Sequence, residues 1–65
     1  MNILKLKGKM VEKGVNVDWL AGATGLSRST VYRKMESADF TVREAMIIKD
    51  ALDLTRDEAH DIFLA

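Results

Sequence analysis

The chain of 65 residues has no cysteine and no proline, and its only histidine is His60. Without cysteine, neither a disulfide nor a thiolate-bound zinc ion can stabilise the fold, and one histidine makes no metal-ligand cluster. No apolar run is long enough to cross a membrane, and residues 1–10 lack the apolar stretch of a signal peptide. We therefore expect a small cytoplasmic protein that needs no cofactor and is stabilised by helix packing and a second copy.

The chain also has no net charge, because ten basic residues balance ten acidic residues. The two signs are nevertheless separated along the sequence. Residues 1–34 hold seven basic and two acidic residues, a net charge of +5, and residues 35–65 hold three basic and eight acidic, a net charge of −5. Such a split allows one positive face toward phosphate and one negative face away from it. Two solvated faces without a partner are the alternative.

Four segments share a pattern that is typical of the start of a helix: an apolar residue, a capping residue, three further residues and another apolar or small residue. They are VNVDWL (15–20), LSRSTV (26–31), FTVREA (40–45) and LTRDEA (54–59). Each second residue can accept hydrogen bonds from unpaired N–H groups of a first turn, and Glu44 and Glu58 complete capping boxes. The pattern predicts an all-α fold of five helices, over about 3–13, 17–23, 28–35, 42–52 and from Arg56 onward.

The segment ATGLS connects the second and third predicted helices. Gly25 can take a left-handed conformation at no steric cost, so it ends one helix and turns the chain sharply. Leu26 then enters the core, and the small side chain of Ala21 allows the two helices to approach closely. These features predict a helix-turn-helix over about residues 17–36.

On the third predicted helix, Val31 and Met35 face one side and four residues form an arc on the other side: Arg28, Ser29, Tyr32 and Arg33. A helix that enters the major groove of DNA needs short hydroxyls near phosphates and long hydrogen-bonding side chains that reach base edges. We therefore predict base contacts for these four residues, although an ordinary solvated helix face is the alternative. The residues predicted to contact phosphate are Asn16, Ser27, Thr30 and Lys34. Whether Arg33 or Lys34 faces the bases is left open.

The stretch NVDWLAGATGLSRSTVYRKME resembles the helix-turn-helix of the lambda-repressor-like, or Cro-like, proteins of phages and bacteria. The matched positions are Leu20, Ala21, Gly25, Leu26, residues 27–30 and Val31. The continuation FTVREAMIIKDALDLTRDEAHDIFL is similar to the fourth and fifth helices of small phage regulators of Gram-positive hosts. The resemblance covers nearly the whole chain and implies one compact five-helix lambda-repressor-like domain over residues 1–65.

The resemblance further implies a sequence-specific transcriptional repressor that binds double-stranded DNA in the cytoplasm of a bacterial host cell. No serine has a plausible base nearby and no pair of carboxylates is framed by a pocket, so we expect no enzymatic activity and no small-molecule ligand. Repression would be steric, because an occupied operator denies the polymerase its promoter. The alternative function is a helical protein–protein module, such as an antirepressor or antitoxin-like partner, with the acidic C-terminal half as its interface.

The end of the sequence predicts a homodimer. Ile62, Phe63 and Leu64 follow one another, and one helix face cannot bury all three. Two-fold pairing there would set two third helices about one DNA turn apart, roughly 34 Å, on a near-palindromic operator. We expect the dimer to be weak, because the acidic residues nearby oppose tight self-association. The loop at residues 37–40 is the alternative interface.

Overall fold

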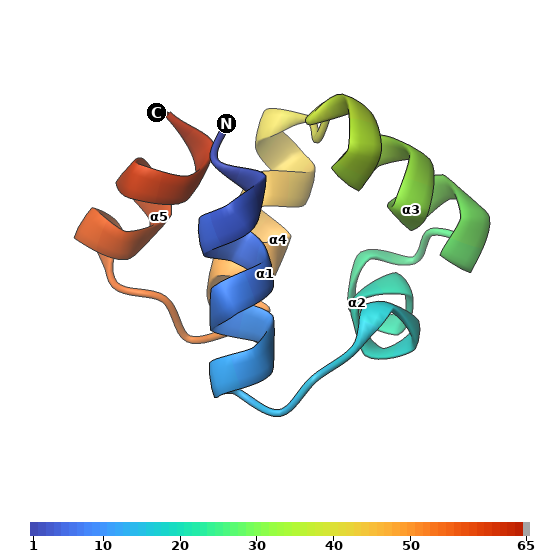
Figure 1. The fold of residues 1–65 in the computed structure, drawn as a ribbon, viewed down its shortest axis with the longest axis horizontal. Coiled ribbons are helices and arrows are strands. Elements are labelled where there is room, and N and C mark those ends of the chain that lie inside the picture. The colour runs from blue at the N-terminus through green and yellow to red at the C-terminus, as the bar shows by residue number, and fades with distance from the viewer. Residues whose placement is uncertain (65) are drawn as a thin grey trace.

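The computed structural model describes residues 1–64, and in this part of the chain the fold is all-α with five helices, as the sequence predicts. The helices are α1 (Ile3–Glu12), α2 (Val17–Thr24), α3 (Arg28–Ser37), α4 (Val42–Ala51) and α5 (Arg56–Phe63). In Figure 1, α1 crosses in front of α4, with α5 on one side of this pair and α2 and α3 on the other. The helix bounds differ from the predicted ones by no more than two residues.

Side-chain caps begin every helix in the described part of the chain. Asn16 Oδ1 accepts a hydrogen bond from the Trp19 N–H at 2.9 Å, and Ser27 Oγ accepts one from the Thr30 N–H at 3.2 Å. Complete capping boxes join Thr41 to Glu44 and Thr55 to Glu58. All four predicted caps are thus confirmed, and Asn2 caps α1 in the same way although the sequence pattern did not single it out.

Gly25 makes the turn between α2 and α3. Its φ of 75° lies in the left-handed region, and its N–H donates to the Ala21 carbonyl at 2.9 Å. A side chain with a Cβ is strained in this conformation, so the glycine is required by the backbone and not by space. Buried Leu20 and Val31 sit on either side of the turn, so the turn sets how α3 projects from the rest of the fold.

The core is formed from one face of each helix. Its most buried side chains, each at most 2% exposed, are Leu6, Leu20, Val31, Ile48, Leu52 and Ile62. α4 contacts both α2 and α5, and α1 contacts α5, so α4 connects the two sides of the molecule. At ~25 cal/mol per Å² of buried apolar area, burial of these aliphatic side chains is the main favourable contribution to folding.

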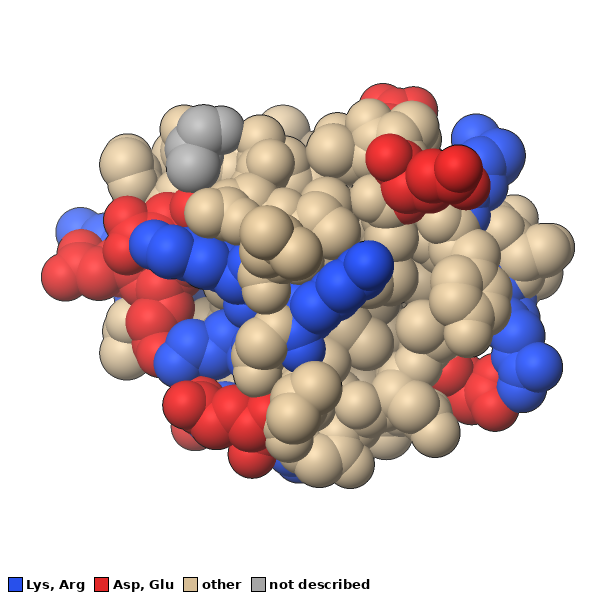
Figure 2. Space-filling view, viewed as in Figure 1, with Lys and Arg blue, Asp and Glu red and all other residues tan. Residues whose placement is uncertain are grey.

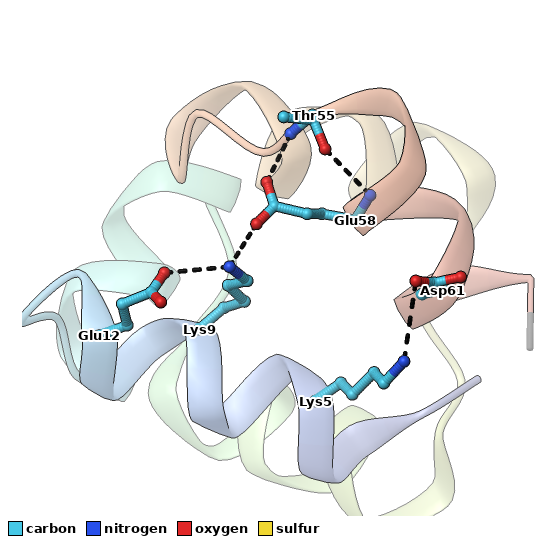
Figure 3. Close-up of polar contacts among 6 residues, drawn as sticks. All are labelled: Lys5, Lys9, Glu12, Thr55, Glu58 and Asp61. Carbon is cyan, nitrogen blue, oxygen red and sulfur yellow. Dashed lines mark hydrogen bonds and ion pairs between the residues drawn. The ribbon is translucent and has the colours of Figure 1, made fainter.

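Hydrogen bonds and ion pairs connect the two ends of the described chain. The Asn2 N–H donates to the Ile62 carbonyl at 2.6 Å, and Lys5 Nζ lies 3.7 Å from Asp61 Oδ2. Lys9 contacts two carboxylates, Glu58 from α5 and Glu12 from its own helix (Figure 3). The ammonium of Lys9 and the Thr55 N–H lower the pKa of Glu58 to about 2, so Glu58 remains ionised far below neutral pH.

The same contacts argue against the expected division of the surface into one positive and one negative face. The basic and acidic halves of the sequence do not form two separate faces, because Lys5 and Lys9 of α1 lie against Asp61 and Glu58 of α5. Figure 2 shows acidic and basic side chains mixed over this side of the molecule. The charge separation along the sequence is therefore partly cancelled where α1 packs against α5.

Candidate nucleic-acid interface

The outer side of α3 carries the residues that were predicted to contact bases. Val31 and Met35 are buried, at 0% and 6% exposure, and thereby fix which side of the helix faces outward. Arg28, Ser29, Tyr32 and Arg33 are all exposed, with Tyr32 at 56%. Exposure alone does not distinguish a binding surface from a solvated one, so the contacts of each side chain matter.

Three hydroxyl groups cluster at the first turn of α3. Ser27 Oγ donates to Thr30 Oγ1 at 2.8 Å and lies 3.3 Å from Ser29 Oγ. They surround the start of α3, where backbone N–H groups have no helical partner and the helix dipole is positive. The combination of short hydroxyls, first-turn N–H groups and a positive dipole suits an anion such as a phosphate.

Arg28, the first residue of α3, is already held by a carboxylate. Its Nε donates to Asp18 Oδ1 and its Nη2 donates to Asp18 Oδ2, which makes a bidentate ion pair between α3 and α2. The hydrogen bond from Arg28 lowers the pKa of Asp18. Nothing in the sequence pattern indicated this pair, because the two residues lie on different helices.

Lys34 points toward α4. Its Nζ lies 3.0 Å from Glu44 Oε1, and only 14% of each side chain is exposed. Between Arg33 and Lys34, it is Arg33 that is exposed, and no ion pair forms at Arg33 within residues 1–64. Lys34 is poorly placed for the predicted phosphate contact, because its ammonium is already paired with the carboxylate of Glu44.

A groove of about 530 Å³ runs beside the exposed side of α3; its lining is mostly apolar and also includes Lys7, Asn16, Tyr32 and Glu36. No motif in the sequence singles out Lys7. No described residue forms an ion pair with Lys7. Asn16 uses its Oδ1 as a helix cap, so its amide NH₂ group still has donors for an outside acceptor.

A second surface lies between α4 and α5. A groove of about 590 Å³ is lined there by apolar side chains, which include Phe40, Val42, Met46, Phe63 and Leu64. Val42, Met46 and Leu64 are 79%, 61% and 73% exposed, which is high for large apolar side chains that lie together. Contiguous exposed apolar surface of this kind often marks an interaction site.

This groove changes the set of residues available for a dimer. Ile62 is 1% exposed and belongs to the core, so it must be removed from the predicted interface. Phe63 is partly buried and Leu64 is exposed, and both line the groove. Phe40, from the alternative interface at residues 37–40, lines the same groove. The two predicted locations are therefore parts of one surface.

Comparison with family models, with curated proteins and with solved structures finds no match to this chain. Within residues 1–64, no group of three or more His, Cys, Asp or Glu side chains is arranged to hold a metal ion. None of the helices there combines the length and the apolar content that crossing a membrane requires.

Proposed function

We propose that the protein binds double-stranded DNA in a sequence-specific manner and inserts the exposed side of α3 into the major groove. The observation that carries this proposal is the chemistry of that side. A cluster of hydroxyls surrounds the positive end of α3, and exposed Arg28, Tyr32 and Arg33 follow it within two turns. Short donors near the backbone and long donors near the bases are the combination that groove recognition requires.

Each side chain then has a distinct role. Arg33 and Arg28 read base edges, with Tyr32 and Ser29 beside them, because their exposed groups lie on the outer side of α3. Ser27, Thr30 and the first N–H groups of α3 bind a phosphate, and Asn16 and Lys7 bind another along the neighbouring groove. Lys34 is left out of this interface, since its charge is paired with Glu44.

The proposal includes a homodimer formed through the apolar groove between α4 and α5. A second copy would cover Val42, Met46 and Leu64, which are otherwise exposed to water. Lys49 and Arg56 also line this groove, and like charges from two copies oppose tight pairing. The dimer is therefore weak, and binding to two half-sites on DNA strengthens it.

In this proposal the protein represses transcription by occupying an operator, as the resemblance to Cro-like phage regulators implies. It works in the cytoplasm of a bacterial host, without a catalytic step, a cofactor or a small-molecule ligand. Occupancy depends on protein concentration and on the weak dimer. Steric repression needs no further activity, because a protein seated on a promoter is enough to exclude polymerase.

The decisive experiment is selection of bound duplexes from a random pool, followed by measurement of affinity against salt. We expect a near-palindromic sequence whose half-sites are one helical turn apart, roughly 10 base pairs. Affinity for that duplex should fall steeply with salt, because each phosphate contact releases counterions. A matched variant pair is Arg33→Ala, which should lose selection at one position, and Arg43→Ala on α4, which should not. Failure of the pool to enrich any sequence would refute the proposal.

The apolar groove also favours the alternative function, a protein–protein module. In the acidic C-terminal half, Glu58 and Asp61 are paired with Lys9 and Lys5 of α1. The apolar groove is therefore a better protein interface than the acidic side chains that the sequence suggests. Salt-insensitive association with another protein and no duplex selection would support this alternative. Steep salt dependence with duplex selection would support DNA binding.

A further inference from the structure

The bidentate pair between Asp18 and Arg28 connects two helices at the surface proposed to face DNA. Asp18 is the second residue of α2, and Arg28 is the first residue of α3. The two side chains are 55% and 62% exposed, so the pair lies at the surface and not in the core. Hydrogen bonding lowers the pKa of Asp18 and raises the pKa of Arg28, so both groups remain charged near neutral pH. Exposed pairs of this kind contribute little to stability.

The contact occupies one edge of the guanidinium and leaves another edge open. Nε and one N–H of Nη2 face the carboxylate of Asp18. A guanidinium has five N–H donors, so three remain: two on Nη1 and the second on Nη2. Guanine offers two acceptors in the major groove, O6 and N7, and a bidentate contact needs two parallel donors. While the pair with Asp18 is intact, only the outer end formed by Nη1 and Nη2 supplies them.

We propose that Asp18 is a positioning residue that commits Arg28 to reading a base. This inference rests on the proposed binding of DNA through α3. Asp18 holds the guanidinium in one orientation before DNA arrives, which reduces the side-chain entropy lost on binding. Its negative charge also offsets the charge of the guanidinium, so Arg28 attracts the DNA backbone less than an unpaired arginine would. An unpaired arginine in the same place would bind phosphate and base edges alike.

The test compares affinities for the selected duplex, for the same duplex changed at the base that Arg28→Ala relaxes, and for a shuffled duplex. In the Asp18→Asn protein, discrimination between the first two should fall by about fivefold or more, the equivalent of one good bidentate contact. Affinity for the shuffled duplex should rise, because the protein loses the negative charge of Asp18 and the guanidinium of Arg28 is no longer paired with a carboxylate. A purely structural role for Asp18 would instead weaken binding to all three duplexes together.

Three further variants sharpen the test. Asp57→Asn removes the same charge from the same helical position in α5, and it should leave discrimination unchanged. Asp18→Glu keeps the charge and should keep affinity for the shuffled duplex low. In an Arg28→Ala background, Asp18→Asn should no longer alter discrimination, because the side chain that it positions is gone.

The outcomes separate this inference from the proposed function. If the wild-type protein selects a duplex and Asp18→Asn discriminates as well as wild type, Asp18 does not position Arg28. An effect of Asp18→Asn that persists without Arg28 would also overturn the inference. If the wild-type protein selects no duplex, the proposed function fails and this inference fails with it.

Discussion

The ammonium of Lys34 lies 3.0 Å from Oε1 of Glu44, and this same oxygen accepts the Thr41 N–H at 2.9 Å. One carboxylate oxygen therefore joins α3 to the capping box of α4. The Thr41 N–H and Lys34 both lower the pKa of Glu44. The pair therefore helps to hold the proposed recognition helix against α4.

Replacement of Lys34 by methionine should lower the free energy of unfolding by about 1–3 kcal/mol, because a largely buried carboxylate loses a charged hydrogen-bond partner. Urea denaturation measures this loss directly. Lys13→Met is the matched control, since Lys13 is exposed and should change stability by less than about 0.5 kcal/mol. Equal stability of the two variants would show that the Lys34 pair contributes nothing.

Lys7 and Lys5 should differ in their effect on DNA binding although they are two residues apart. Lys7 lines the groove beside Tyr32, whereas Lys5 lies against Asp61 on the other side of α1. Lys7→Ala should reduce the slope of log affinity against log salt by about 1, the contribution of one phosphate contact. Lys5→Ala should leave that slope close to the wild-type value. Equal slopes for both variants would remove Lys7 from the interface.

Replacement of glycine by alanine should have opposite effects on stability at Gly25 and at Gly8. Gly25→Ala should destabilise by about 1–2 kcal/mol, because a φ of 75° is unfavourable for a residue with a Cβ. Gly8→Ala should stabilise by about 0.5–1 kcal/mol, because Gly8 lies inside α1 and an added Cβ meets nothing within 4 Å. Thermal unfolding should therefore shift in opposite directions. A stabilising Gly25→Ala would contradict the left-handed turn.

Glu58 should make the free energy of unfolding depend on pH in the acidic range. Its pKa is about 2 in the folded protein, below the ordinary value of 4.5, because of the Lys9 ammonium and the Thr55 N–H. Glu58 therefore takes up a proton more readily in the unfolded chain than in the folded protein. Its contribution to the free energy of unfolding is complete above about pH 4.5 and is lost as pH falls toward 2. Glu58→Gln should flatten the decline in unfolding free energy over this window. Asp57→Asn, which alters an exposed neighbour outside this network, should leave the decline in place.

Leu64→Glu should weaken self-association without unfolding the monomer, because Leu64 is 73% exposed and lies in the apolar groove. Sedimentation velocity and cooperativity on a two-half-site duplex measure the effect. Leu4→Glu is the matched control, since Leu4 is 80% exposed on α1 and does not line the groove. A Leu64→Glu protein that still occupies both half-sites cooperatively would place the dimer contact elsewhere.

The helices could be predicted from the sequence because their signals are local. A capping residue such as Thr41 and its partner Glu44 lie three positions apart, so the pattern that defines the helix start is complete within one turn. The left-handed turn at Gly25 follows from one residue type for the same reason. Local chemistry therefore fixed the five helices to within two residues.

The partners of charged side chains could not be predicted in this way, because they depend on helix packing. Arg28 with Asp18 and Lys34 with Glu44 are each ten residues apart and join different helices. Lys9 meets Glu58 from almost the opposite end of the chain. The run of three apolar residues at 62–64 predicts an interface position for Ile62, and only its position against the core identifies it as buried.

The contact between Asn2 and Ile62 also bears on the order in which the fold assembles. Closing α1 onto α5 brings together nearly the full length of the described chain, which costs more chain entropy than forming the local pair of α2 and α3. We expect α1 and α5 to join last during folding and to part first during partial opening. An opening in which α5 also leaves α4 would disrupt the α4–α5 groove while α2, α3 and α4 remain folded, so the surface proposed for a second copy would be lost before the exposed side of α3.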